Sequence, residues 1–264
     1  MKLGFIGCGN MGGALIGGIL KHHICEASEI LASTPDQACA ERVRRTYKIE
    51  VTPDNRRVAK ECDTLVLAIK PQFYEEVIGE IRNELSDSKI VVSIAPGKTL
   101  EWLDLQFGRP LKLVRCMPNT PAMVGEGITG VCCNKQVQKE ELESICELLS
   151  GCGKTEVLPE SLMDVVVSVS GSAPAYVFMF IEAMADAAVA DGMPRAQAYK
   201  FASQAILGSA KMVLETGKHP GELKDMVCSP GGTTIEAVRV LEEKGFRSAV
   251  IEAMKACTSK AKGM

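Results

Sequence analysis

The first half of the chain alternates short apolar runs with segments whose apolar residues recur at helical spacing. The runs predict six strands, at residues 2–6, 29–32, 49–52, 64–69, 89–93 and 112–116. The segments between them, such as 37–46 and 73–85, predict helices. Such alternation is typical of a parallel sheet with helices on both faces, so we expect an α/β domain over residues 1–160.

From Leu162 onward the strand signals stop and helix start and stop signals become dense. Helices are predicted at residues 175–191, at 194–217 and from Pro220, and apolar stripes continue through 235–241 and 246–254. We therefore expect residues 161–264 to form an all-helical second domain.

The first of these helices is apolar on nearly every side between Tyr176 and Ile181. A helix without a polar face must be covered all round. The pattern leaves two alternatives open, burial within the core of the chain or burial against a second subunit, because about 100 helical residues hardly surround such a helix alone.

Composition narrows the function classes. The chain has 264 residues, is 46% hydrophobic and carries a net charge of −3, which gives no basic surface for nucleic acid or anionic membrane. The most apolar helix is interrupted by Glu182 and Asp186, so we expect a soluble protein with no membrane span.

The eleven cysteines show no metal or disulfide pattern, since none forms CxxC and only three histidines accompany them. Cys62, Cys116 and Cys132 lie in or beside apolar runs, where a free thiol behaves as a small hydrophobe. We predict no metal site and a reducing, cytoplasmic location.

The N-terminal stretch MKLGFIGCGNMGGALIGGIL allows two interpretations, a signal peptide or a phosphate-binding turn. Glycine costs about 1 kcal/mol per helical position, so its seven glycines disfavour a signal helix. Gly7, Gly9 and Gly12 instead form GxGxxG directly after a short strand and at the start of a helix, which predicts a pyrophosphate site at the helix N-terminus.

The second strand indicates which dinucleotide binds. NAD-binding folds usually end this strand in Asp or Glu, whereas this one ends in Ala32, Ser33 and Thr34. Hydroxyls accept a 2′-phosphate that a carboxylate repels, which favours NADPH, with NADH possible. Asp36 lies nearby and is also a suitable helix cap.

Three further loops carry candidate chemistry. AIKPQ (68–72) and MPNTP (117–121) end the fourth and sixth strands, at the sheet edge where ligands of such folds bind. SPGGTT (229–234) precedes a helix, and its exposed amides suit a carboxylate. Thr233 or Thr234 serving only as a helix cap is the alternative.

Together GFIGCGNMG, AIKPQ, MPNTP, SGSAPAY (170–176), HPGELKDMV (219–227) and SPGGTTIEAVRVLE (229–242) resemble the pyrroline-5-carboxylate reductase family over nearly the whole chain. The resemblance implies a cytoplasmic oxidoreductase acting on a CH–NH group, which reduces 1-pyrroline-5-carboxylate to L-proline with NAD(P)H. It also implies a Rossmann domain followed by a helical domain that dimerises, with a homodimer or a decameric assembly of dimers as the oligomer.

The resemblance also assigns site residues. The positions that match the family's pyrophosphate site are Gly7, Gly9, Asn10, Met11 and Gly12. Those on the adenosine side are Ser33 and Asn55, and those along the nicotinamide ribose are Ala68, Lys70 and Pro71. The remaining cofactor positions are Ile6, Thr34, Ile69, Ala95, Met117 and Asn119. Substrate positions are Val227, Ser229, Gly231, Gly232, Thr233 and Thr234. Thr234 is the candidate catalytic residue, as a hydrogen-bond partner of the imine nitrogen.

The chain departs from the family pattern at Ala173, where SGSGPAY is usual, and at Val167, where threonine is usual. Two other functions remain open. A β-hydroxyacid dehydrogenase needs a catalytic lysine, for which Lys200 and Lys211 are candidates by position alone. A non-catalytic NADPH-sensing protein would keep the glycine turn without needing SPGGTT.

Overall fold

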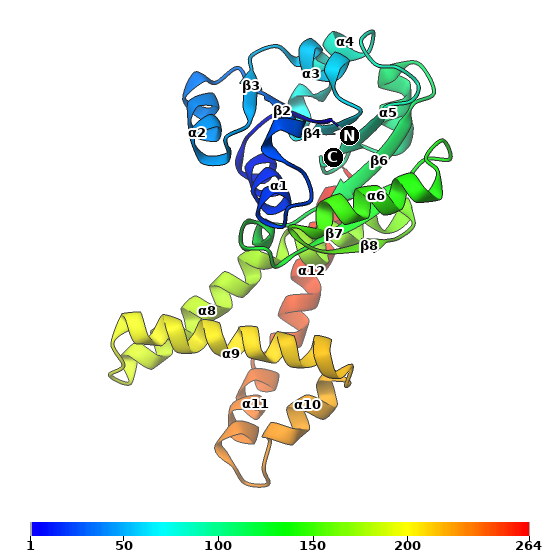
Figure 1. Cartoon of the computed structure of the whole chain (residues 1–264). Helices are drawn as coiled ribbons and strands as arrows, with labels where there is room; N and C mark the ends of the chain where they lie inside the picture. The colour runs from blue at the N-terminus through cyan, green and yellow to red at the C-terminus, as the bar shows by residue number, and fades with distance from the viewer. Residues whose placement is uncertain (1, 264) are drawn as a thin grey trace. The chain divides into compact units, whose positions relative to one another are not determined.

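The computed structural model describes residues 2–263, which form two compact units (Figure 1). Unit 1 contains the chain up to Ser172 together with the segment from Cys257 onward. Unit 2 spans Ala173–Ala256. The chain therefore passes between the units twice, at the start of one helix and within the last one.

Unit 1 is built on one eight-stranded sheet with the order β3-β2-β1-β4-β5-β6-β7-β8. The strands are β1 Leu3–Ile6, β2 Ile30–Ser33, β3 Glu50–Thr52, β4 Thr64–Leu67, β5 Ile90–Ser93, β6 Lys112–Met117, β7 Gly127–Cys133 and β8 Gly153–Val157. The first six are parallel, which confirms the six predicted strands.

Two strands were not predicted. β7 pairs antiparallel with β6, and β8 pairs parallel with β7 at the edge of the sheet. β8 reads GKTEV and leaves most of its side chains exposed or half-buried, so it carries no apolar run. Its pairing with β7, rather than a hydrophobic pattern of its own, defines it as a strand.

Helices cover both faces of the sheet, as expected. On one face α1 Asn10–Lys21, α2 Gln37–Tyr47 and α6 Lys139–Ser150 share an apolar cluster with alternate strand residues. On the other face α3 Asn55–Glu61, α4 Tyr74–Ile81 and α5 Leu100–Phe107 share a second cluster. The sheet is thus buried on both sides, which is why its strands read as continuous apolar runs.

The predicted apolar cysteines lie inside these clusters. Cys116 belongs to the first cluster, and Cys62 and Cys132 belong to the second. Burial raises the pKa of Cys62 to about 11 and that of Cys132 to about 12. These thiols stay protonated at neutral pH and pack as small hydrophobes.

Between the sheet and unit 2 the chain forms α7 Met163–Val166 and a π-helical turn at Val167–Gly171. Unit 2 is made of α8 Ala173–Ala190, α9 Arg195–Thr216, α10 Pro220–Val227, α11 Thr233–Glu243 and most of α12 Phe246–Lys262. Within the described residues no strand follows β8, which confirms the all-helical second half.

Helix α8 decides between the two alternatives for its apolar surface. Ala185 is its one buried residue, while Phe178 is 61% and Met179 is 70% exposed. Burial within the core of the chain is therefore wrong. By length and composition the continuous stretch Glu160–Ala190 is also apolar enough to cross a membrane, a property that helices covered by protein share.

Candidate functional site

The turn between β1 and α1 has the geometry of a phosphate-binding loop. Gly7 has a φ of +97°, and a Cβ there would lie 2.5 Å from the Ala68 carbonyl oxygen. A Cβ at Gly12 would lie 2.6 Å from the Gly7 oxygen, so the helix packs too closely for any side chain. A Cβ at Gly9, the N-cap of α1, would meet nothing within 4 Å, which leaves open space at the helix amides. These residues therefore fit a pyrophosphate.

A cavity of about 420 Å³ lies beyond the carboxyl ends of the central strands. The cofactor residues predicted from sequence that line it are Gly9, Asn10, Met11, Ala68, Ile69, Lys70, Ala95, Met117 and Asn119. Loops that follow four different strands and lie up to about a hundred positions apart in sequence thus meet at one place. This cavity suits the nicotinamide half of a dinucleotide.

Other lining residues of this cavity were not predicted: Ile94, Pro96, Pro118, Thr120 and Gly171. Pro118 and Thr120 belong to the MPNTP loop and Gly171 to SGSAPAY, so their motifs carried a signal. Ile94 and Pro96 follow β5, where the sequence offers no polar motif.

Two predicted cofactor residues, Ile6 and Pro71, do not line the cavity. Ile6 is buried as the last residue of β1, so its side chain belongs to the core. Pro71 begins a short 3₁₀ turn directly after Lys70 and fixes the direction of the loop that follows β4.

The predicted adenosine-side residues are joined to each other. Ser33 is fully buried at the end of β2, and its hydroxyl donates to Asn55 Oδ1 at 2.7 Å. The Asn55 amide in turn donates to Glu80 at 2.8 Å. The pair therefore ties the end of β2 to the start of α3. Thr34, the third residue predicted for this side, directly follows Ser33 in the chain.

The acid that follows the end of β2 caps the next helix. Asp36 is the N-cap of α2, and its carboxylate accepts from the amides of Ala38 and Cys39 at 2.9 and 3.2 Å. The Thr34 hydroxyl accepts from the Asp36 amide at 3.3 Å. The capping role suggested by the sequence is confirmed, so this carboxylate is engaged by the first turn of α2.

Asn119 lines the cavity and also makes two hydrogen bonds that hold the fold. Its Nδ2 donates to the Ser170 carbonyl at 3.2 Å, and its Oδ1 accepts from the Ile128 amide at 2.9 Å. The side-chain amide thus joins the MPNTP loop to the π turn and to β7.

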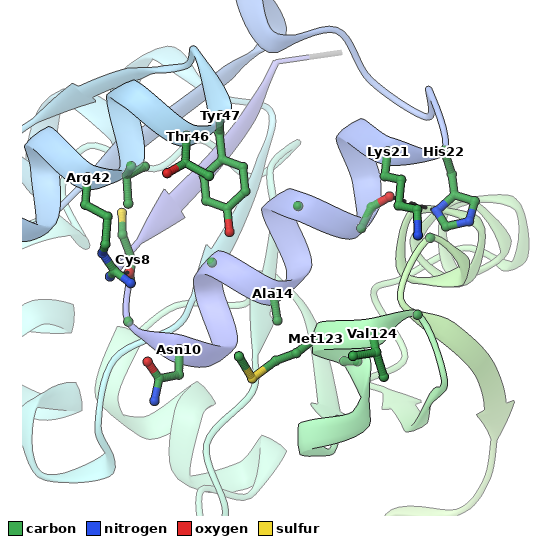
Figure 2. Close-up of a pocket in the computed structure, with 18 residues that line it drawn as sticks. Cys8, Asn10, Ala14, Lys21, His22, Arg42, Thr46, Tyr47, Met123 and Val124 are labelled. Carbon is green, nitrogen blue, oxygen red and sulfur yellow. Dashed lines mark hydrogen bonds between the residues drawn. The ribbon is translucent and has the colours of Figure 1, made fainter. Parts of the chain in front are cut away.

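A second cavity, of about 350 Å³, lies along the glycine-rich face of α1 (Figure 2). Figure 2 shows Tyr47 over this helix and Arg42 beside Cys8. The Arg42 guanidinium donates to the Cys8 carbonyl at 3.4 Å. Lys70, Ala95 and Met117, which are predicted cofactor residues, line the first cavity and not this one.

The predicted substrate loop lies in unit 2, between α10 and α11. Gly231 has a φ of +68°, and the Gly232 amide donates to the Ser229 carbonyl at 3.0 Å. Gly232 is the N-cap of α11, with no side-chain cap. Thr233 and Thr234 are the first two helical residues, so the capping alternative for either threonine is wrong.

A cavity of about 430 Å³ opens at this helix start, lined by Gly231, Gly232, Thr233, Glu236, Ala237 and Val240. Thr234 is half-buried beside it, and Val227 is exposed at the end of α10. Uncapped helix amides next to a cavity are a suitable seat for a carboxylate.

Comparison with known proteins identifies the family. A model described as pyrroline-5-carboxylate reductase dimerisation matches residues 160–264, and one described as NADP oxidoreductase, coenzyme F420-dependent, matches residues 2–97. Pyrroline-5-carboxylate reductase of Escherichia coli (strain K12) is 53% identical over 98% of this chain and 96% of its own length. The chain belongs to the pyrroline-5-carboxylate reductase family.

Solved structures of this family agree. Plasmodium falciparum pyrroline carboxylate reductase with NADP bound is 34% identical, has a TM-score of 0.91, and is matched over 100% of this chain and 97% of that one. The pyrroline-5-carboxylate reductase from Coxiella burnetii is 32% identical with a TM-score of 0.92, over 99% and 97% of the two chains.

Family membership confirms the resemblance deduced from the motifs and makes this reductase an oxidoreductase of the NADP-dependent kind. It also excludes the β-hydroxyacid dehydrogenase alternative. Lys200 and Lys211, the lysines considered for that role, are both exposed on α9, and Lys211 pairs with Glu215.

Proposed function

We propose that this protein reduces 1-pyrroline-5-carboxylate to L-proline with NADPH, using the β1–α1 turn and the 420 Å³ cavity for the dinucleotide and the 229–234 loop for the substrate. The observation that carries the proposal is the uncapped start of α11. A helix N-terminus preceded by two glycines, with no side chain of its own on the free amides, suits a carboxylated substrate.

In this proposal residues 7–12 bind the pyrophosphate, Ser33, Thr34 and Asn55 lie on the adenosine side, and residues 68–71 with Ala95, Met117 and Asn119 lie along the nicotinamide half. The absence of an acid at the end of β2 supports NADPH, because a carboxylate at that position would repel its 2′-phosphate. The bound dihydronicotinamide supplies a hydride.

The substrate carboxylate lies on the free amides of Thr233 and Thr234 at the start of α11, since the Gly232 amide already donates to the Ser229 carbonyl. The hydride adds to the carbon of the C=N bond, and the ring nitrogen, which carries a proton in the reactive iminium, keeps it as an amine. Thr234 hydrogen-bonds this nitrogen through its hydroxyl. The protein's side chains and amides thus act mainly by positioning the two reactants, which lowers the activation barrier by up to about 7–11 kcal/mol in well-oriented reactions.

The exposed apolar surface of α8 and the match to a dimerisation model support a homodimer formed through residues 161–264. A decameric assembly of such dimers and a cytoplasmic location complete the proposal.

The test is NADPH oxidation with matched substrates. We expect 1-pyrroline-5-carboxylate to drive it, whereas the isomeric imine 1-pyrroline-2-carboxylate and a 2-keto acid do not. Only the first has its C=N carbon and its carboxylate-bearing carbon on opposite sides of the ring nitrogen; in the other two the reacting carbon itself bears the carboxylate. Tight NADPH binding without turnover of any imine would instead indicate a sensing protein and contradict the proposal.

A further inference from the structure

The π turn at Val167–Gly171 is held away from regular helix geometry. The Ser172 amide donates to the Val167 carbonyl at 2.8 Å, five residues earlier. Pro174 has no N–H to give to the Ser170 carbonyl four residues before it. Asn119 Nδ2 donates to that carbonyl instead, at 3.2 Å. One side of the turn is therefore fixed to the loop after β6.

The other side of the turn is held by the end of the chain. Thr258, on the last turns of α12, donates through its hydroxyl to Ser168 Oγ at 2.8 Å. Ser168 is buried and directs its own proton to the Val165 carbonyl at 2.9 Å, so its oxygen is free to accept. The neighbouring Cys257 thiol donates to the Ser172 hydroxyl at 3.3 Å. Both contacts join residues of unit 1 that are at least 85 positions apart.

The turn forms part of the cofactor cavity. Gly171, its last residue, lines the cavity together with Met117 and Lys70. A Cβ at Gly171 would lie 3.1 Å from Met117 Cε, so turn and strand end are already in close contact. A small shift of the turn would therefore change the width of the cavity on its nicotinamide side.

We propose that Thr258 is a positioning residue of this reductase: through Ser168 its hydroxyl holds the π turn in place as a wall of the nicotinamide cavity. The inference rests on the proposed function, which assigns that cavity to NADPH. The pyrophosphate turn lies elsewhere on the cavity, so loss of the Thr258 bond affects the placement of the reacting ring more than the affinity for the dinucleotide.

Thr258→Val tests the inference, because it removes the hydroxyl and keeps the shape. We expect kcat to fall on the order of tenfold, since small misplacements of reacting groups are costly, with KM for NADPH changed by less than about twofold. Thr258→Ser restores the hydroxyl and should recover most of the rate. Ser259→Ala, on the exposed face of the same turn, is the matched control and should leave kcat unchanged.

A double-mutant cycle identifies the bond. Ser168→Ala should lower kcat as Thr258→Val does, and the double variant should be no slower than either single variant. Fluorescence of bound NADPH gives a readout independent of turnover: Thr258→Val should change its intensity at saturation, and Ser259→Ala should not.

Thermal unfolding separates positioning from stability alone. If Thr258→Val lowers Tm but retains the wild-type kcat and NADPH fluorescence, the inference is overturned. If the wild-type protein binds NADPH but does not turn over 1-pyrroline-5-carboxylate, the proposed function fails instead, and the fluorescence comparison still decides whether Thr258 shapes the cavity.

Discussion

Polar side chains around the two sites differ in whether they already hydrogen-bond to other groups of the protein. Asp36 caps α2, Ser33 donates to Asn55, and Asn119 holds the π turn, so their roles in the free protein are structural. Thr234 contrasts with them, because Gly232 and not a threonine is the N-cap of α11. Its hydroxyl is the one to which we assign a role in the reaction.

Thr234→Ala should therefore slow reduction of 1-pyrroline-5-carboxylate on the order of 10²-fold, with NADPH affinity and Tm nearly unchanged. Thr234→Ser should recover most of the rate. Steady-state kinetics of both variants, with Thr233→Ala as the milder neighbour that keeps its backbone amide, check this. Wild-type turnover by Thr234→Ala would contradict the assigned role.

The cofactor residues show how far a sequence predicts a site. GxGxxG is local, so Gly7, Gly9 and Gly12 are recognisable from spacing. Gly171 joins the same cavity from a distant segment, because the π turn folds back against the end of β6. Ile94 and Pro96 have no local signature, and their position depends on strand order.

At the scale of elements, the six parallel strands are predictable because both faces of each are buried. β7 and β8 are not: β8 is a mostly polar edge strand, and β7 reverses direction against β6. The helices of the second half follow from their Gly and Pro boundaries, for example Gly217 with φ +63° at the end of α9. The apolar pattern of α8 did not show whether the chain's own core or a second subunit covers this helix.

Helix α8 carries the prediction on assembly. Light scattering at micromolar concentration should give a mass of at least twice the 28.3 kDa of one chain, because α8 exposes large apolar side chains that a partner must cover. Phe178→Glu should shift the mass toward the monomer, since it places a charge in that interface.

Leu105→Glu is the matched control: Leu105 is 73% exposed on α5 in unit 1, and the charge there should leave the mass unchanged. A wild-type mass of one chain, or flotation of the protein with lipid vesicles, would contradict a protein interface on α8.

For the whole molecule, the buried thiols couple stability to alkaline pH. Burial raises the pKa of Cys8 and Cys132 to about 12 from the ordinary value of 9.0. At pH values between the two, the folded state keeps protons that the unfolded state loses, so the free energy of unfolding falls as pH rises. Burial lowers the pKa of Lys89, so this one group makes the free energy of unfolding rise with pH and offsets only part of the effect of the thiols.

We therefore expect Tm to be nearly constant around neutral pH and to fall between about pH 8.5 and 10. Cys132→Ala should flatten this dependence, because it removes one of the groups that titrate on unfolding. Calorimetry across this range checks the slope. A Tm that stays constant to pH 10, or the same slope in Cys132→Ala, would contradict the coupling.

The proposed reaction transfers a hydride from NADPH to the C=N carbon of a cyclic imino acid. The most direct measurement uses NADPH carrying deuterium in both positions at C4, with 1-pyrroline-5-carboxylate as the acceptor and mass spectrometry and NMR of the product. We predict L-proline with one deuterium at C5 for each NADPH oxidised. Proline without deuterium at C5, or oxidation of NADPH without formation of proline, would contradict the account.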